Sequence, residues 1–534
     1  PPLSLGKLDA FMEALLTILA AAGPKVLIAG DKVEKVLWSV VGKVPSLRKL
    51  VTTSSLAAAA ASMEAQGDPG LPAEKLAGSD LAFLQFTSGS TSAPKGVMVT
   101  HQSLAANCTA IMTQAIASKP GVDLAVSWLP LYHDMGLIGF VLSPILGGGL
   151  GVAYIPTLSF IKNATLWMET LHRLKGTMTF APNFAYALVT KRARAEQIAR
   201  WDLSHMRIFG CGAEPINPET MRAFVDKFHA AGLKPEALLP CYGMAEATLA
   251  ISFVGLSEVL KTDRIDAEGY HKERAAKPVG PQPSADQEAG APAVLEVVSC
   301  GRTFPDHEVR IRGEDGSFLP ERSVGEICLR GPSVAAGYFQ NPEASRAAGM
   351  GPGGDGFLRT GDLGYLAGGE IYVSGRIKDI LIVNGRNYYP QRIEWLVDEM
   401  PGVRKGSSVV FTRPGKASEE IVVAVESRDP APDQLSKTIA ERINEEFQLA
   451  VADVRIVPPG ALPKTSSGKL QRRKTRQQYL DGTLGTEGVR TLGGSQAWAS
   501  RLLVAKHLAY SLVGRAQHHA RGIVRRFLPP QPRN

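Results

Sequence analysis

Short apolar runs alternate with amphipathic stretches over the first part of the chain. Residues 25–30 (KVLIAG) and 47–53 (LRKLVTT) are predicted to be short buried strands separated by a helix. Residues 81–86 (LAFLQF) predict another strand, and residues 101–116 (HQSLAANCTAIMTQAI) an amphipathic helix. The alternation of strands and helices predicts an α/β fold.

The pattern changes in the middle of the chain. Residues 256–298 are rich in charge, Pro, Ala and Gly and have weak periodicity, which predicts a long surface excursion without a core of its own. Residues 308–313 (EVRIRG) and 325–331 (GEICLRG) alternate in the manner of antiparallel strands.

A smaller α/β unit is predicted after Arg376, because strand patterns at 402–412, 419–427 and 451–460 flank a helical pattern over 434–447. The predicted organisation follows: an N-terminal α/β domain with mixed sheets and packed helices (1–377), a small α/β C-terminal domain (378–484) and a tail (485–534).

Composition and charge narrow the classes of protein. The chain of 534 residues is 44% hydrophobic and 21% charged, as expected of a soluble globular protein, and no apolar stretch has the length of a membrane span. The five cysteines are scattered without a CxxC pair, which favours reduced thiols in a cytoplasmic protein over a zinc site or disulfides. The net charge is +8, but residues 485–534 hold eight basic and one acidic side chain, leaving +1 on the rest. A nucleic-acid-binding core is therefore not indicated.

The loop FTSGSTSAPKGV (86–97) follows the predicted strand at 81–86 and is rich in glycine and hydroxyl groups. Its spacing does not fit the G-x-x-x-x-G-K-[ST] phosphate loop. Glycine still allows a close backbone approach, while hydroxyls and a lysine suit a polyphosphate. A plain Ser/Gly-rich turn is the alternative. The candidate phosphate-binding residues are Thr87, Ser88, Gly89, Ser90, Thr91 and Lys95.

Five further motifs follow in order: GCGAEPI (210–216), CYGMAEATL (241–249), LRTGDLGYL (358–366), GRIKDILIVNGRNYYPQRIE (375–394) and LPKTSSGKLQRRK (462–474). With the first loop they resemble the adenylate-forming superfamily, which includes acyl-CoA synthetases, luciferases and peptide-synthetase adenylation domains. The resemblance covers about residues 81–480. It implies an enzyme that uses ATP and Mg²⁺ to convert a carboxylic acid into an acyl-adenylate with release of pyrophosphate.

The resemblance also implies roles for individual residues. The phosphate loop would hold the β- and γ-phosphates, Tyr242 would stack on adenine, and Asp362 would accept hydrogen bonds from both ribose hydroxyls, with Arg376 as a further donor. Glu246 is the expected Mg²⁺ ligand. The other residues expected to contact the nucleotide are Gly212, Ala213, Glu214, Pro215, Gly243, Met244 and Ala245.

Lys469 is the expected catalytic residue, since its ammonium can bridge the substrate carboxylate and the α-phosphate. The alternative is one more lysine in a basic stretch. The resemblance further implies a mobile C-terminal domain that rotates about a hinge at Lys378, with one orientation for making the adenylate and another for passing it on.

The stretch LPLYHDMGLIGFVLSPILGGG (129–149) places His133 among apolar residues, which favours an apolar substrate. His133 is expected near the carboxylate or at the mouth of an acyl tunnel, and a structural role is the alternative. HDMGLIG, YGMAEATLAIS, the excursion at 256–298 and GRNYYPQRIE resemble fatty acyl-AMP ligases. Their implied substrate is a long-chain fatty acid, and their implied acceptor is an acyl carrier protein or polyketide synthase.

Two departures leave alternatives open. Fatty acyl-AMP ligases carry an insertion before the TGD motif that restrains the small domain. In this chain the corresponding residues 341–362 form a short, glycine-rich segment. An acyl-CoA synthetase is therefore the second hypothesis. The N-terminal portion is shorter than in the family, so a third hypothesis is an inactive remnant that binds carrier proteins. The basic, partly apolar tail (498–530) is expected to contact anionic membranes or an acidic carrier protein, or to have no partner.

Overall fold

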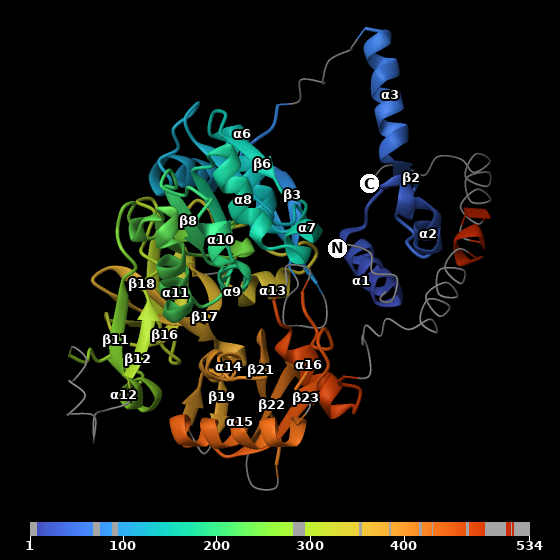
Figure 1. The fold of residues 1–534 in the computed structure, drawn as a ribbon. Coiled ribbons are helices and arrows are strands. Elements are labelled where there is room, and N and C mark those ends of the chain that lie inside the picture. The colour runs from blue at the N-terminus through green and yellow to red at the C-terminus, as the bar shows by residue number, and fades with distance from the viewer. Residues whose placement is uncertain are drawn as a thin grey trace. The chain divides into compact units, whose positions relative to one another are not determined.

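The computed structural model describes residues 8–67, 75–87, 94–280, 294–351, 355–383, 386–415, 419–429, 431–465, 469–485, 509–513 and 515–516. These residues form helices and several sheets, which confirms the predicted α/β class (Figure 1). The chain divides into two compact units. One contains Pro1–Ala77, Phe86–Gly96 and Arg490–Asn534, and the other contains Gly78–Gln85 and Val97–Val489.

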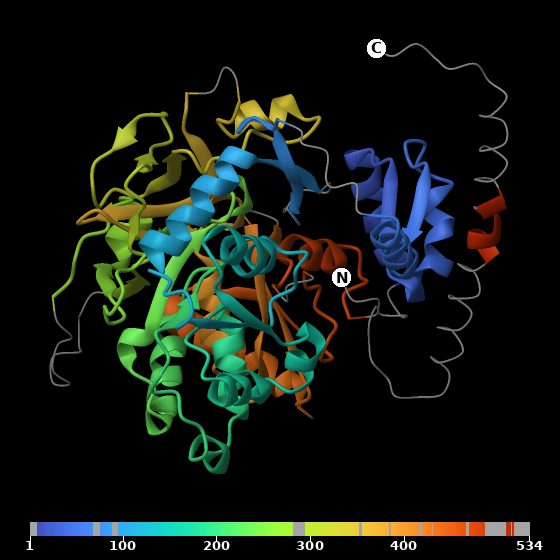
Figure 2. The same ribbon diagram turned by 90° about the horizontal axis from the view of Figure 1, so that it is seen from above.

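The first unit is built on a parallel pair of strands, β1 (Val26–Ala29) and β2 (Lys49–Thr52). The helices α1 (Leu8–Ala22), α2 (Asp31–Val41) and α3 (Thr53–Ala65) accompany them and are dark blue in Figure 2. Both predicted strands are confirmed, but their predicted burial is wrong. Val26 and Ile28 are 49% and 59% exposed, whereas Ala29 is buried. In a two-stranded sheet alternate side chains face the core, and only that face is covered.

The phosphate-loop region contains a strand that the sequence pattern did not predict. The loop joins β3 (Leu81–Thr87) to β4 (Lys95–Thr100), which pair in a two-stranded sheet, and only then does α4 (His101–Ala110) begin. The predicted order strand–loop–helix is therefore wrong. Thr100 starts α4 with a capping box, because its hydroxyl accepts the Ser103 amide hydrogen bond at 3.1 Å. The helix ends in one π-helical turn, η2 (Ile111–Ala115).

A seven-stranded sheet in the order β13-β10-β9-β8-β7-β5-β6 forms the centre of the second unit. Strands β5 to β9 run parallel, β10 is antiparallel to β9, and β13 is antiparallel to β10. The strands are β5 (Leu124–Ser127), β6 (Gly151–Tyr154), β7 (Met178–Ala181), β8 (Ile208–Cys211), β9 (Leu238–Gly243), β10 (Ala250–Phe253) and β13 (Arg302–Thr303). The helices between them are α5 (Asp134–Leu137), η3 (Ile138–Leu142), α6 (Ser143–Leu146), α7 (Thr157–Lys162), α8 (Thr165–Leu174), α9 (Asn183–Arg192), α10 (Ala195–Ile198) and α11 (Pro218–Phe228).

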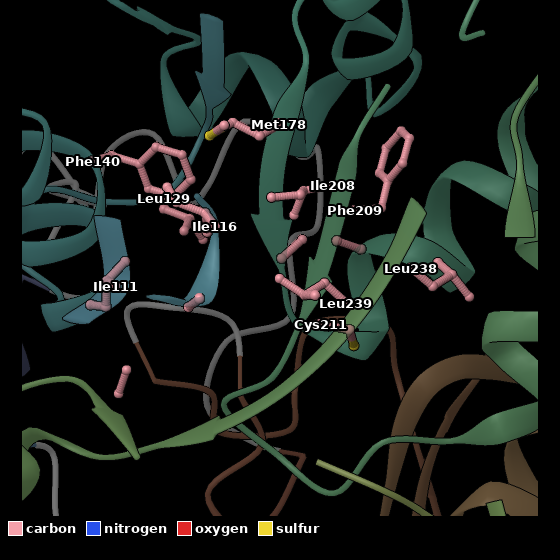
Figure 3. Close-up of a cluster of buried hydrophobic side chains, with 14 of the residues drawn as sticks. Ile111, Ile116, Leu129, Phe140, Met178, Ile208, Phe209, Cys211, Leu238 and Leu239 are labelled. Carbon is pink, nitrogen blue, oxygen red and sulfur yellow. The ribbon is translucent and has the colours of Figure 1, made fainter. Parts of the chain in front are cut away.

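The core of this region is an extended cluster of apolar side chains around the sheet. Figure 3 shows a part of it, in which Phe140, Met178, Ile208 and Leu239 come from separate elements. Trp128, Trp167 and Phe160 add large rings that are at most 2% exposed. Trp128 and Phe160 stack with centroids 3.9 Å apart. This packing fixes the ends of the parallel strands, from which the candidate site is built.

The excursion at 256–298 is more ordered than its composition predicted. Its described residues form β11 (Thr262–Asp266), α12 (Ala267–Lys272) and β12 (Val294–Val298), with β11 and β12 paired antiparallel. Ile265, Tyr270 and Leu295 are at most 2% exposed, so the excursion contributes to a buried cluster. A periodicity argument does not detect these short segments, because each has only one to three buried residues.

A five-stranded antiparallel sheet follows in the order β15-β14-β16-β17-β18. The strands are β14 (Glu308–Arg312), β15 (Phe318–Leu319), β16 (Gly325–Arg330), β17 (Leu358–Ala367) and β18 (Glu370–Arg376), with α13 (Pro342–Ala347) between β16 and β17. The two antiparallel strands predicted at 308–313 and 325–331 are confirmed, and they pair with each other in the register Ile311↔Ile327.

Residues 378–484, which we call the C-terminal lobe, have their own cores; residues 97–377 are called the main lobe. The C-terminal lobe begins within η8 (Ile377–Asp379) and contains β19 (Leu381–Val383), β20 (Arg386–Tyr388), α14 (Pro390–Asp398), β21 (Val403–Pro414), β22 (Glu419–Ser427), α15 (Pro432–Phe447), β23 (Val451–Val457) and α16 (Arg472–Leu480). Strands β22 and β23 are parallel and joined by α15, which lies along one side of the three-stranded sheet in Figure 1. The three predicted strands and the predicted helix are confirmed.

The described part of the tail is helical at 509–513 and 515–516. The guanidinium carbon of Arg515 lies 5.7 Å from the ring centroid of Trp38 in the same unit. Across the described ranges, every helix is too short or too polar to cross a bilayer.

Candidate active site

The candidate nucleotide-binding residues lie where strands of two sheets end or meet. Strands β8 and β9 are parallel neighbours, so the turn Gly212–Pro215 after β8 and the residue Tyr242 in β9 reach the same edge. Asp362 in β17 lies directly opposite Arg376 in β18. The pairing of β8 with β9 and the pairing of β17 with β18 therefore position the side chains that the sequence motifs identified.

Tyr242, Asp362 and Arg376 form one connected group. The Tyr242 hydroxyl donates to Asp362 Oδ2 at 2.8 Å, and Arg376 Nε donates to Asp362 Oδ1 at 3.1 Å. Burial raises the pKa of Asp362, and the Arg376 charge and the Tyr242 hydrogen bond act against that rise. A carboxylate offers about four acceptor positions. Two of them remain after these contacts, which is the number that a pair of ribose hydroxyls requires.

The turn after β8 has an unusual backbone at Ala213, which adopts the left-handed region with φ +74°. Such a conformation is rare for a residue with a Cβ and needs support from its surroundings. Asn183 provides it, since its Nδ2 donates to the carbonyl of Pro215 at 2.5 Å and its Oδ1 accepts from the Asn217 amide at 3.2 Å. Asn183 was not predicted, and its only signal in the sequence is a position two residues after the apolar strand β7.

Lys469 reaches this turn from the C-terminal lobe. Its Nζ donates to the carbonyl oxygen of Ala213 at 2.6 Å. Burial lowers the pKa of Lys469, while the nearby carboxylates of Glu214, Asp134 and Asp362 act in the opposite direction. Burial raises the pKa of Glu214, which Lys469 counteracts. The structure thus brings together Lys469, Ala213 and the Asp362 group, although they are distant in sequence.

Glu246 lies in η6 (Ala245–Ala247), directly after β9, and is half-buried. The Tyr338 hydroxyl donates to Glu246 Oε1 at 2.7 Å. The described residues contain no cluster of three or more His, Cys, Asp or Glu side chains suited to a metal. A single carboxylate fits Mg²⁺ at a nucleotide, because this ion takes one or two protein carboxylates and completes its shell with phosphate oxygens and water. Tyr338 was not predicted.

A buried polar network supports the segment after Glu246. Thr248 is fully buried with φ +65°, a strained conformation for a β-branched residue, and its hydroxyl donates to the carbonyl of Ser333 at 2.7 Å. Asn107 bonds to both the amide and the carbonyl of Ala250, at 3.0 and 2.8 Å. Gly243 is needed here, since an added Cβ would lie 2.0 Å from the Leu249 carbonyl oxygen. Of the other predicted contact residues, Met244 is half-buried and Ala245 is buried.

His133 precedes α5 and is 27% exposed, with Nδ1 2.5 Å from Asp134 Oδ1. Burial disfavours the charged form of Asp134, but the charge and hydrogen bond of His133, together with Lys469, lower its pKa overall. Asp134 therefore links His133 electrostatically to the region of Lys469. Two residues further on, Gly136 packs so closely on the Pro130 carbonyl that an added Cβ would lie 2.1 Å away.

The predicted phosphate loop is described only at its two ends. Thr87 ends β3 and Lys95 begins β4, both half-buried. Ser88, Gly89, Ser90 and Thr91 lie outside the described residues. Thr87 and Lys95 belong to the first compact unit, whereas the groups described above belong to the second. The role of this loop remains a prediction.

The predicted hinge, Lys378, lies in η8 between the main and C-terminal lobes. The next residue, Asp379, accepts from Arg472 Nη1 at 2.9 Å, and Arg472 Nη2 donates to both carboxylate oxygens of Glu394 at 2.7 and 2.8 Å. Arg472 starts α16, three residues after Lys469. One guanidinium thus joins the hinge, α14 and the segment that carries the candidate catalytic lysine.

Comparisons with known proteins agree with this geometry. The family described as AMP-binding enzyme matches residues 9–339, and the family described as Disco-interacting protein 2-like, AMP domain matches residues 378–489. The chain belongs to the AMP-binding enzymes. The resemblance to the adenylate-forming superfamily is thereby confirmed.

Three of the matches to this AMP-binding enzyme carry descriptions that name acyl or fatty acyl substrates. A Caulobacter vibrioides protein described as an acyl-CoA synthetase is 37% identical over 91% of this chain and 81% of its own. The medium-chain-fatty-acid–[acyl-carrier-protein] ligase JamA of Moorena producens is 36% identical over 76% of this chain and 68% of its own. A solved structure from work on fatty acyl-adenylate ligases of E. coli and L. pneumophila is 34% identical, covers 90% of this chain and 83% of that chain, and has a TM-score of 0.81.

Proposed function

We propose that this enzyme activates a long-chain fatty acid with ATP and Mg²⁺, releases pyrophosphate, and passes the acyl group to the phosphopantetheine arm of a carrier protein or polyketide synthase. The observation that carries the proposal is the contact of Lys469 Nζ with the Ala213 carbonyl, beside the Tyr242–Asp362–Arg376 group. A cation carried by the C-terminal lobe thus lies beside the residues proposed to bind the nucleotide.

The residues divide the first half-reaction between them. Asp362 would hold the ribose, Tyr242 would cover the adenine, and Glu246 would ligate a Mg²⁺ ion, which neutralises phosphate charge when bound. Lys469 would stabilise the charge that builds as the fatty acid carboxylate attacks the α-phosphorus and pyrophosphate departs. Fixed donors of this kind are typically worth about 10²–10³ in rate. We assign Lys378 the role of the hinge and His133 a place beside the carboxylate.

The acyl acceptor distinguishes the proposed fatty acyl-AMP ligase from an acyl-CoA synthetase. The carrier-protein ligase JamA supports transfer to a carrier protein, and the fatty acyl-adenylate ligases support the adenylation step. The Caulobacter relative described as an acyl-CoA synthetase favours coenzyme A instead. An inactive protein that only binds carrier proteins is the candidate of another class.

Product analysis tests all three. The protein is incubated with ATP, Mg²⁺ and a series of fatty acids, pyrophosphate release is followed, and coenzyme A or a holo carrier protein is added to separate samples. Release of pyrophosphate and acylation of the carrier protein alone are expected. Efficient acyl-CoA formation would favour the synthetase, and absence of pyrophosphate release with every acid would favour the inactive protein. The Lys469→Ala variant serves as the negative control for pyrophosphate release and acyl transfer.

A further inference from the structure

The loop that carries Lys469 is closed by hydrogen bonds of its own backbone. The Lys469 amide donates to the Thr465 hydroxyl oxygen at 3.0 Å, and the Thr465 amide donates to the Lys469 carbonyl oxygen at 2.7 Å. Next to this pair, Lys464 and Leu470 form an antiparallel bridge. These bonds fix the main chain of Lys469 relative to Thr465, so the loop itself determines where the Lys469 side chain begins.

Lys464 attaches the base of this loop to a bulge in β21. The register of the strand shifts between Val403 and Ser408, and Gly406 within the bulge has φ +66°, a left-handed conformation that suits glycine. Lys464 Nζ donates to the Gly406 carbonyl oxygen at 3.2 Å and to the Ser407 hydroxyl oxygen at 3.1 Å. The bulge thus supplies two acceptors to the base of the loop.

The bulge is held in turn from within the C-terminal lobe. Asp398, the last residue of α14, accepts from the Ser407 amide at 3.3 Å and from the Ser408 hydroxyl at 2.6 Å. Both serines are 1% exposed. Polar groups that are buried and hydrogen-bonded in this way make a rigid support.

The bulge also contacts helix α9 of the main lobe. Helix α9 packs on β21, and a Cβ added at Gly406 would lie 3.9 Å from Phe184 Cβ, which is an ordinary van der Waals separation. The preceding residue, Asn183, supports the turn that contains Ala213. The first two residues of α9 therefore contact both the bulge that supports Lys469 and the turn that Lys469 Nζ reaches.

We propose that Lys464 and Thr465 are positioning residues for adenylation, which place the Lys469 ammonium at the Ala213 turn. The contacts form a closed ring that runs from Lys469 through Thr465 and Lys464 to the bulge, then through α9 and back to the turn. Such a ring limits the movement of Lys469 Nζ, because each member is held by two neighbours. A misplacement of about 1 Å can cost about 10²-fold in rate. The inference rests on the proposed role of Lys469.

The ring is complete only in the orientation that makes the adenylate. The hydrogen bonds of Lys464 and Thr465 lie within the C-terminal lobe and persist when this lobe rotates about the proposed hinge. The contacts with α9 and Ala213 join the two lobes and are lost on rotation. The two positioning residues are therefore expected to matter for adenylation and to matter little for acyl transfer, in which Lys469 has left the turn.

The test uses isosteric and conservative variants of the whole chain. Thr465→Val keeps the shape of the side chain but lacks the hydroxyl, and Thr465→Ser keeps the hydroxyl. Lys464→Met removes the ammonium, and Lys464→Arg keeps a charged donor. Lys437→Met is the matched control, since Lys437 is 71% exposed on α15 of the same lobe. Pyrophosphate release gives kcat and the KM for ATP, and transfer from supplied acyl-adenylate to a holo carrier protein is measured separately.

Thr465→Val and Lys464→Met are each expected to lower kcat for pyrophosphate release about threefold to tenfold, the effect of one or two lost hydrogen bonds. The KM for ATP and the rate of acyl transfer stay within about twofold of wild type, and Thr465→Ser and Lys464→Arg recover most of kcat. Unchanged kcat in both variants overturns the positioning role. An equal fall in Lys437→Met, or an equal fall in acyl transfer, also overturns it, because either would indicate general damage to the lobe.

A second measurement separates this inference from the proposed function. Reductive methylation of the Lys469 amine, followed by mass spectrometry, reports how well the Ala213 turn shields it. The amine is expected to be labelled about threefold to tenfold faster in Thr465→Val than in wild type. Equal labelling overturns the positioning role, whether or not the protein releases pyrophosphate. Faster labelling in the variant together with no pyrophosphate release by wild type would support the positioning role and contradict the proposed function.

Discussion

At the scale of single residues, the proposed catalytic role of Lys469 can be tested most directly. Lys469→Ala is expected to slow acyl-adenylate formation about 10²–10³-fold, because it removes a fixed positive charge from the developing transition state. Pyrophosphate release under single-turnover conditions measures this step. Lys474→Ala serves as the control, since Lys474 is exposed in the same basic stretch. An equal loss of rate in both variants would show that the overall positive charge of this stretch matters, and would contradict a specific role for Lys469.

The pH dependence of that step follows from the same residue. Burial lowers the pKa of Lys469 below the ordinary lysine value of 10.5. In the proposed role the protonated amine is the active form, so the rate of adenylation is expected to decline with rising pH at values below 10.5. Lys469→Arg keeps its charge over this range. A rate–pH profile that declines equally in Lys469→Arg would assign the loss to another group.

Asp362 allows a separate prediction about nucleotide affinity. Asp362→Asn removes the charge that is proposed to accept the two ribose hydroxyls and leaves Arg376 without its charged partner. The KM for ATP is therefore expected to rise at least about tenfold. Because burial raises the pKa of Asp362, wild-type ATP affinity should also weaken on acidification before pH 3.8 is reached. KM measured across a pH series checks both statements. An unchanged KM in the variant would remove Asp362 from the nucleotide site.

At the scale of elements, Arg472 at the start of α16 holds η8 and α14 together. Its side chain is 15% exposed, and those of Asp379 and Glu394 are 17% and 12% exposed. Breaking a buried pair leaves charge uncompensated and typically costs about 3–5 kcal/mol. Arg472→Ala is therefore expected to destabilise the C-terminal lobe in urea unfolding, and Arg472→Lys to restore only part, because lysine lacks the two-pronged contact with Glu394. Full restoration by lysine would contradict this account.

The sequence predicted most elements whose pattern is strong and local. The strands around Val410, Val423 and Val454 and the helix that connects them carry clear periodicity. The motifs also singled out Asp362, Arg376 and Lys469, which the structure brings near one another. Contacts made only by folding were not predictable. The Tyr338 hydroxyl on Glu246 joins residues 92 positions apart, and no local pattern specifies that pair. The strand β4 was missed because glycine, proline and lysine dominate its start.

At the scale of the whole molecule, the basic tail is the remaining feature without an assigned role. Deleting residues 485–534 removes eight basic side chains and one acidic side chain. If the tail contacts anionic membranes, the deletion abolishes co-sedimentation with phosphatidylserine vesicles, since each basic residue near such a surface contributes about 1 kcal/mol. Pyrophosphate release should remain. Vesicle binding that persists after deletion, or that is insensitive to salt, would contradict the membrane hypothesis.

The contact between Lys469 and Ala213 has a consequence for how this enzyme family can be surveyed. The acceptor is a main-chain oxygen, which every amino acid supplies, and the Ala213 backbone is already in a conformation that glycine tolerates. Ala213→Gly would therefore leave this carbonyl acceptor chemically intact. A screen of side-chain variants in the main lobe would therefore overlook it, and only an edit to the peptide backbone itself, such as an ester in place of the amide, would report on its strength.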